Sequence, residues 1–163
     1  MLDTRAGGKG VSGTRSSGMG AKSANDILGA EYDWLAGDGD GHVALFSTAG
    51  GGYAPDVFLR DTDAHAAAIG AVLACAATTS ARFAPTLASK CENTWKLVAE
   101  RGLFAYDADI DGGPYRMVAA PEVAIEAAHL PEVAVDVIRR LTFARLRFVD
   151  LSTLSERALL HGG

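Results

Sequence analysis

Apolar and polar residues alternate with a period of two in two neighbouring segments near the start of the folded part of the chain. The segments are Ala30 to Ala36 and His42 to Thr48, and the residues from Asp38 to Gly41 between them are turn formers. Because successive side chains of a strand point to opposite faces, this pattern predicts a β-hairpin.

The same alternation predicts how the hairpin presents its side chains. We expect Trp34 and Ala36 to share one face with Val43 and Leu45 of the second strand. The triplet Gly50–Gly52 then ends that strand, because glycine weakens a strand and favours loops and bulges.

Apolar residues recur at the helical period in three later segments. These segments are residues 62–77, 91–101 and 131–140. Asp61 is placed to cap the first helix, Gly102 to end the second in a left-handed conformation, and Pro131 to start the third. A last helical turn is predicted over residues 155–160.

A second hairpin is predicted from Leu103 to Asp107 and from Tyr115 to Ala119, joined by the turn formers of residues 109–114. Further extended segments are expected at residues 56–59, 123–125 and 143–149. The strand pairs have tight turns, and the helices do not alternate singly with strands. The order therefore predicts an α+β fold, with an antiparallel sheet of about five to six strands and about two to three packing helices.

Composition divides the chain into a tail and one domain. Residues 1–25 are rich in glycine, serine and basic residues, which favours a disordered tail, and residues 26–163 then form a single α+β domain. The tail carries a net charge of +3, so the total of −5 leaves −8 on the domain. An acidic domain disfavours nucleic acid and anionic membranes as partners and suits a basic protein.

Several classes of protein are disfavoured by what the sequence lacks. The longest apolar run, from Ala64 to Ala77, is shorter than a membrane span, and no apolar segment follows the basic residues at the start as in a signal peptide. Cys75 and Cys91 lack the C-x-x-C spacing of redox or zinc sites. We therefore expect a cytoplasmic protein with reduced thiols.

The segment from Asp38 to His42 has alternating carboxylates, as calcium loops do. The sixth position of such a loop would be Val43 instead of glycine, and the twelfth would be Ala49 instead of glutamate. Gly50–Gly52 could cradle a phosphate, but no P-loop lysine accompanies it. We therefore predict no metal site and no cofactor.

The first hairpin also carries a resemblance. Residues 32–36, 38, 41–50 and 55 are similar to a group of small uncharacterised bacterial proteins that open with a W-L-x-x-D-x-x-G-x-V-A-x-F-x-T-x-G hairpin. Residues 106–107, 113–116, 130–131 and 148 are similar to the rest of that pattern. Proteins of this style resemble immunity proteins, so the resemblance implies binding and neutralisation of a toxin.

Two functional hypotheses remain open. The first is a non-enzymatic protein-binding module, plausibly an immunity-type inhibitor, whose acidic surface binds a basic partner. Its candidate contact residues are the carboxylates at the hairpin tips, which are Asp38, Asp40, Asp107, Asp109 and Asp111. Glu100 is a further candidate.

The second hypothesis is a small hydrolase or transferase with a site near Gly50–Gly52. It would require Asp40 and His42 to converge with a nucleophile, either Ser47 or Cys91. Such chemistry needs the nucleophile and the base within hydrogen-bond reach of each other.

Overall fold

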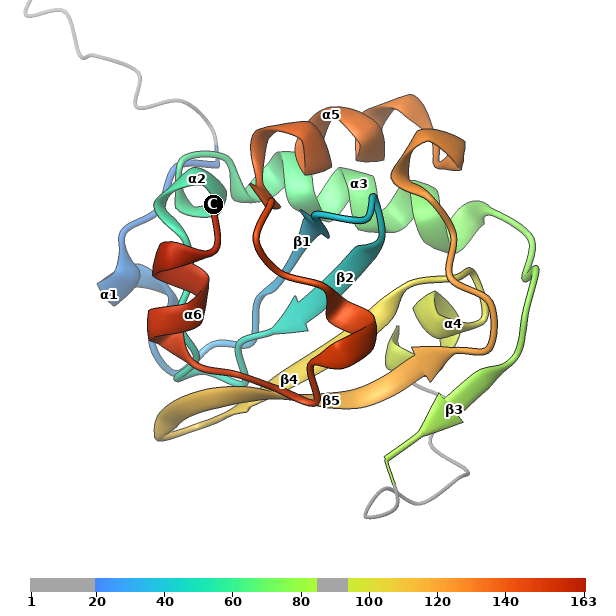
Figure 1. The fold of residues 1–163 in the computed structure, drawn as a ribbon. Coiled ribbons are helices and arrows are strands. Elements are labelled where there is room, and N and C mark those ends of the chain that lie inside the picture. Colours follow the sequence, from blue (N-terminus) through green and yellow to red (C-terminus); the bar gives the residue numbers. More distant parts are fainter. Residues whose placement is uncertain (1–19, 85–93) are drawn as a thin grey trace, which may run out of the picture.

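Among the residues that the computed structural model describes, 20–84 and 94–163, seven strands form one mixed sheet (Figure 1). The sheet has the order β3-β5-β4-β2-β1-β6, and β7 pairs with β5. The strands are β1 (Asp33–Asp38), β2 (Val43–Ser47), β3 (Ala81–Phe83), β4 (Phe104–Asp109), β5 (Gly112–Pro121), β6 (Thr142–Phe143) and β7 (Thr153–Leu154).

The longer helices lie on one face of this sheet, with α3 and α5 side by side over β1 and α4 over β4 and β5 (Figure 1). The helices are α1 (Ala24–Ile27), α2 (Asp56–Leu59), α3 (Thr62–Ala74), α4 (Thr94–Ala99), α5 (Glu132–Arg140) and α6 (Glu156–His161), with 3₁₀ turns η1 (Ala127–His129) and η2 (Phe148–Asp150). Within the described ranges no helix has the length and apolar character needed to span a bilayer.

Both faces of the central hairpin are buried. Trp34 pairs with Phe46 in the register of β1 and β2, and their rings stack with centroids 4.1 Å apart. On the other face, Leu35 pairs with Leu45 beneath the helices. The apolar pattern of the strands therefore supplies two cores, one on each side of the sheet.

The predicted hairpin is confirmed, but the predicted face assignment is wrong. Trp34 and Ala36 share their face with Phe46 and Ala44, whereas Val43 and Leu45 point to the helices. A shift of one residue in register exchanges the faces of a strand, and the connecting turn fixes that register.

The prediction of an antiparallel sheet is also corrected. The α+β class is right, but β2 runs parallel to β4 and β1 runs parallel to β6. The chain between β2 and β4 passes through α3 and α4, and such a crossover brings the next strand back in the same direction. Both tight hairpins remain antiparallel as predicted.

Three predicted extended segments have a different structure. Residues 56–59 form α2, which starts after Pro55 with Asp56 in its first turn, as helix starts commonly do. Residues 123–125 are not a strand, because β5 already extends to Pro121 and pairs there with β3. Residues 143–149 leave the sheet after Phe143 and turn into η2.

The predicted helices are confirmed in the described residues, with small changes at their ends. Asp61 caps α3 by accepting the N–H of Ala64, and the helix ends at Ala74 instead of Ala77. α5 and α6 follow their predictions. α4 occupies part of the predicted helix 91–101, whose first three residues lie outside the described ranges.

The chain is packed onto the domain from Gly20 onward. The carbonyl of Gly20 accepts hydrogen bonds from the N–H and the hydroxyl of Thr62, and Lys22 donates its N–H to Leu59. Ser23 and Asp26 cap α1 reciprocally. Residues 20–25, which the prediction placed in the tail, are thus part of the fold, and residues 1–19 lie outside the described ranges.

His65 closes a gap in the hydrogen bonding of β1. β6 pairs only with Gly37 and Asp38, so it does not reach the N–H of Leu35. The Nδ1 atom of buried His65 accepts that N–H at 3.0 Å instead. Burial lowers the pKa of His65 to about 4, which keeps the ring neutral and able to accept.

Two glycines give a matched test of this fold. Gly102 has a φ of +92°, and a Cβ there would lie 2.7 Å from Ile125, so Gly102→Ala should lower the free energy of unfolding by about 1–3 kcal/mol. Gly70 lies in α3 with open space around it, so Gly70→Ala should raise it by about 0.5–1 kcal/mol. Urea denaturation measures both, and equal effects would contradict the described backbone.

Candidate functional site

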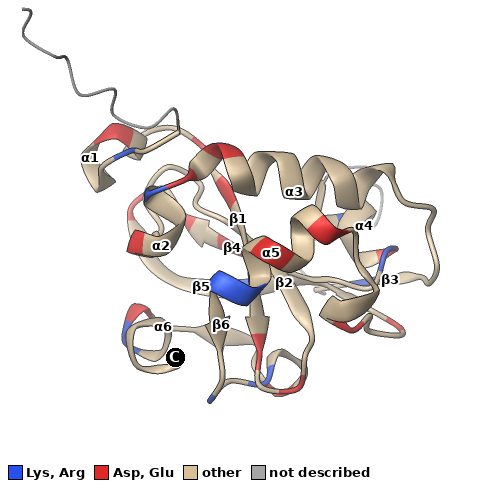
Figure 2. Ribbon diagram, turned by 90° about the horizontal axis from the view of Figure 1, so that it is seen from above, with Lys and Arg blue, Asp and Glu red and all other residues tan. Residues whose placement is uncertain are grey.

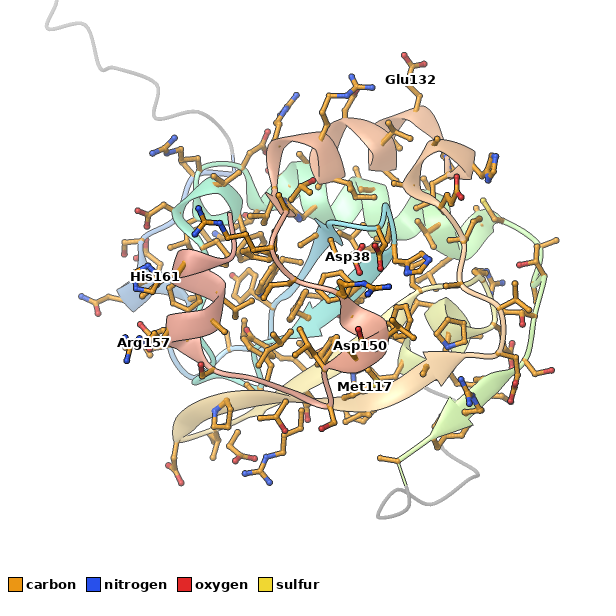
Figure 3. All side chains as sticks on the ribbon, viewed as in Figure 1. Asp38, Met117, Glu132, Asp150, Arg157 and His161 are labelled. Atoms are coloured by element: carbon orange, nitrogen blue, oxygen red, sulfur yellow. The ribbon has the colours of Figure 1, made fainter. Side chains whose placement is uncertain are left out.

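The turn between β1 and β2 is held by the buried carboxylate of Asp38. Its Oδ1 accepts the N–H groups of Asp40 and His42, both at 2.9 Å, and its Oδ2 accepts the N–H of Phe148 at 2.8 Å. In Figure 3, Asp38 lies toward the middle of the molecule, above Asp150 of η2 in this view. The side chain therefore fixes the turn and ties the C-terminal segment to it.

This geometry removes Asp38 from the predicted partner contacts. Only 3% of the residue is exposed, so its carboxylate is not part of the surface. Asp40 is exposed but forms an ion pair with Arg147, whose Nε lies 2.6 Å from Oδ2. One predicted acidic tip is thus a structural turn with its exposed charge already paired.

The same turn contains the group with the best geometry for a metal ion. Ligand atoms of Asp38, Asp40 and His42 lie within 4.8 Å of one another. Both carboxylates already accept hydrogen bonds, and Arg147 brings a positive charge to Asp40. The two carboxylates are therefore engaged in the turn itself, whereas the Nδ1 atom of His42 is buried with no hydrogen-bond partner.

A different set of polar residues lies at the opposite end of the sheet, where β1 begins and β2 and β4 end (Figure 1). Asp33 pairs in register with Ser47, and Ser47 pairs with Asp107. The alternation that puts Leu35 and Leu45 against the helices puts this row on the same face. Two carboxylates and a hydroxyl thus cross three neighbouring strands.

Ser47 connects this row to α4. Its hydroxyl donates to Oδ1 of Asp33 at 2.6 Å and accepts the indole N–H of Trp95 at 3.1 Å. Ser47 is almost fully buried, and Asp33 and Trp95 are half-buried. The hydroxyl is therefore committed to structural hydrogen bonds and is not presented to solvent as a nucleophile.

Asp107 is the most perturbed carboxyl group of this row. Burial, together with the negative charges of Glu31, Asp109 and Asp33, raises its pKa to about 6, and a hydrogen bond from the N–H of Ala108 opposes this shift. Its Oδ1 is buried with no hydrogen-bond partner. Perturbed carboxyl groups of this kind concentrate at functional sites.

Burial also raises the pKa of Asp33, although the hydrogen bond from Ser47 opposes the effect. We call the carboxylates of this region the acidic end: Glu31, Asp33, Asp107, Asp109 and Asp111. In the part of the chain that the structure describes, no ion pair reaches any of the five. Arg116 stands opposite Asp107 in register without forming one.

A groove of about 450 Å³ lies beside the acidic end. Glu31 and Asp33 line it from the start of β1, and Asp63 lines it from the first turn of α3. Lys22 is the one basic residue in its lining. The groove extends the negative charge of the acidic end from the sheet toward α3.

The glycine triplet does not form an anion cradle. The N–H groups of Gly51 and Gly52 both donate to the carbonyl of Thr48, at 3.0 and 2.7 Å. Gly51 packs against the second hairpin so closely that a Cβ would lie 2.1 Å from the carbonyl oxygen of Ile110. Its role is therefore the close approach of the two hairpins.

The residues of the enzyme hypothesis do not converge. His42 directly precedes β2 and Ser47 ends it, so the two residues lie about 16 Å apart at the usual rise per strand residue. Cys91 lies outside the described residues. Glu100, the further contact candidate, forms an ion pair with Lys96 on α4.

The sequence prediction found three members of the acidic end but missed Glu31 and Asp33. It also missed the hydrogen bond from Trp95 to Ser47. The sequence pattern did contain one signal for Asp33. Asp33 precedes Leu35 by two residues, so it occupies a strand position that faces the core, where a charge is uncommon.

In comparisons with known proteins, no family model, no curated protein and no solved structure matches this chain.

Asp38→Ala should lower the free energy of unfolding by about 2–4 kcal/mol, because it leaves backbone N–H groups without an acceptor. Asp40→Ala is the matched control, since it removes only an exposed ion pair and should have a much smaller effect. Denaturation by urea at pH 7 measures both. Similar losses in the two variants would contradict the structural role of Asp38.

Asp107 should make stability depend on pH in the direction opposite to most carboxylates. Its pKa is raised from 3.8 to about 6, so the folded state loses stability as the pH rises through that interval. Asp107→Asn should raise the free energy of unfolding by about 1 kcal/mol at pH 7.5, where solvent screening reduces the effect of the charge. At pH 4 the same substitution should have almost no effect. Urea denaturation at both pH values checks this, and a gain that is equal at the two would refute it.

Proposed function

We propose that this protein is a non-enzymatic protein-binding module of the immunity type, which neutralises a basic partner through its acidic end. The observation that carries the proposal is the gathering of five carboxylates, which no ion pair reaches in the described ranges, at one end of the sheet. A surface of this kind attracts and orients a positively charged partner.

The distribution of the other charges supports this choice of surface. Elsewhere some of the acidic residues stand beside basic ones, and α5 carries both signs (Figure 2). Asp40, Glu100, Glu122 and Asp136 all form ion pairs. The charges of the acidic end lie close together, so their fields add for an approaching partner.

The tip of the second hairpin adds an apolar anchor to this surface. Ile110 is 72% exposed between Asp109 and Asp111. The backbone of Gly51 packs closely against the carbonyl group of Ile110 and supports the turn. Interfaces combine apolar contacts at their centre with a polar rim. Ile110 and the flanking carboxylates fit that arrangement, with the apolar residue supplying affinity and the charges supplying association rate.

A cytoplasmic location is part of this proposal. Cys75 is a free thiol at the end of α3, and its Sγ lies 3.4 Å from the carbonyl of Ala71. A reducing compartment preserves such a thiol.

The proposal predicts that loss of charge at the acidic end weakens binding. The test variant combines three substitutions at exposed positions: Glu31→Gln, Asp109→Asn and Asp111→Asn. The wild-type chain is used at low salt to capture partners from its native host for identification by mass spectrometry. Association of the variant with the captured protein should be at least about 10-fold slower, and the difference should shrink at high salt.

The matched control removes the same charge from exposed glutamates outside the acidic end: Glu122→Gln, Glu126→Gln, Glu132→Gln. It should retain most of the association rate. A partner that slows growth when expressed alone, and is neutralised by wild type but not by the test variant, would support the immunity role. Failure to capture a basic partner, or an equal loss in the control, would refute the proposal.

A further inference from the structure

An ammonium group of the chain itself lies in the groove beside the acidic end. Lys22 lines this groove, and its Nζ atom lies 6.0 Å from the centre of the Tyr32 ring. The other charged groups of the lining are all carboxylates: Glu31, Asp33 and Asp63. Because an aromatic face attracts a cation within about 6 Å, the ring and the carboxylates act on Lys22 in the same sense. The molecule thus contains an internal example of the group that this groove attracts.

The contact between Lys22 and the groove is loose. In the part of the chain that the structure describes, no ion pair joins Lys22 to a carboxylate. The backbone N–H of Lys22 is held by the carbonyl of Leu59 at 2.8 Å, but the residue is only half-buried. Rotation of the side chain can therefore carry the ammonium out of the groove while the backbone stays in place.

The walls of the groove are fixed more firmly than Lys22. Tyr32 donates its N–H to Oγ1 of Thr48 and accepts the N–H of Thr48 at its carbonyl, at 3.1 and 2.9 Å. Asp63 lies in the first turn of α3, where its carboxylate packs so closely on Gly20 that a Cβ there would lie 2.9 Å from it. Buried Ile69 adds an apolar wall. A preorganised site avoids the cost of ordering its own residues when it binds.

The charge and size of the groove suit a second lysine. Three carboxylates face one ammonium, so negative charge remains in excess. The volume of about 450 Å³ leaves room for another long side chain. Carboxylates only accept hydrogen bonds, and a lysine offers three donors on a stem that packs against apolar surface.

We propose that this groove is a recognition site for one lysine side chain of the basic partner, and that Lys22 is a built-in competitor which the partner displaces. The inference rests on the proposed function and adds a defined contact to it. The ammonium of the partner takes the place beside the Tyr32 ring and among the carboxylates. Its methylene groups pack against the apolar wall, and Lys22 turns into solvent.

The first test needs no natural partner. Tetralysine with blocked ends is titrated into the full chain at low salt, and its affinity is measured by calorimetry. Lys22→Gln should bind the peptide about 3-fold more tightly than wild type, because a like charge leaves the groove. Arg145→Gln is the matched control and should change the affinity much less. Arg145 is exposed and follows Ala144, which packs against the β1–β2 turn at the other end of the sheet.

Two further pairs of variants locate the bound lysine. Tyr32→Leu should weaken tetralysine binding about 3-fold, whereas Tyr32→Phe keeps the ring and should bind like wild type. Asp63→Asn should weaken binding by a similar factor. Glu132→Gln removes an exposed carboxylate from the first turn of α5 and should have a much smaller effect. Equal effects within any of the three pairs would overturn the proposal, as would a failure of tetralysine to bind wild type.

NMR on wild type covers the case in which a variant does not fold. During the tetralysine titration, the side-chain resonances of Lys22 and the ring resonances of Tyr32 should shift together and give one binding constant. Common shifts support displacement of Lys22 from the ring. Resonances of either residue that stay in place while the peptide binds would overturn it.

The captured partner separates this inference from the proposed function. A partner might depend on the acidic end yet bind wild type, Lys22→Gln and Tyr32→Leu with the same affinity. That result would support the proposed function and overturn the recognition site. Tetralysine binding in the groove, with no basic partner captured from the host, would support the lysine site and refute the proposed function.

Discussion

Trp34 stacks on Phe46, and Phe46 stacks on Tyr106, so a continuous stack of aromatic rings crosses three strands on one face of the sheet. The hydroxyl of Tyr106 donates a hydrogen bond to the carbonyl of Leu151 at 2.7 Å, which holds the C-terminal segment over this stack. Helices α3, α4 and α5 cover the other face. Because both faces are occupied, polar groups of the central strands can reach solvent only at the ends of the sheet.

The two ends use their carboxylates in opposite ways. At the β1–β2 turn, Asp38 satisfies three backbone N–H groups, and Asp40 is paired with Arg147, so the charges there stabilise the fold. At the acidic end, Asp33 has one donor and Asp107 has a buried oxygen with none. Charge kept in this state costs stability, and perturbed carboxyl groups of this kind are enriched at functional sites.

The binding proposed for the acidic end and the raised pKa of Asp107 would draw on the same electrostatics. The like charges that would attract a basic partner also raise the pKa of Asp107, because every carboxylate nearby disfavours another ionised neighbour. A cation brought by a partner would reverse that effect and favour ionisation. The groove lined by Glu31, Asp33 and Asp63 adds to the same field.

The sequence by itself determined the α+β class, both hairpins and the helix starts at Asp61 and Pro131, because strand alternation, turn residues and caps are local properties. Only the tertiary structure decided the parallel pairs, the faces of the first hairpin and the fate of residues 143–149. The last segment leaves the sheet where Asp38 binds the N–H of Phe148, 110 residues later in the chain. The row across Asp33, Ser47 and Asp107 likewise needs a parallel pairing whose register no local pattern encodes.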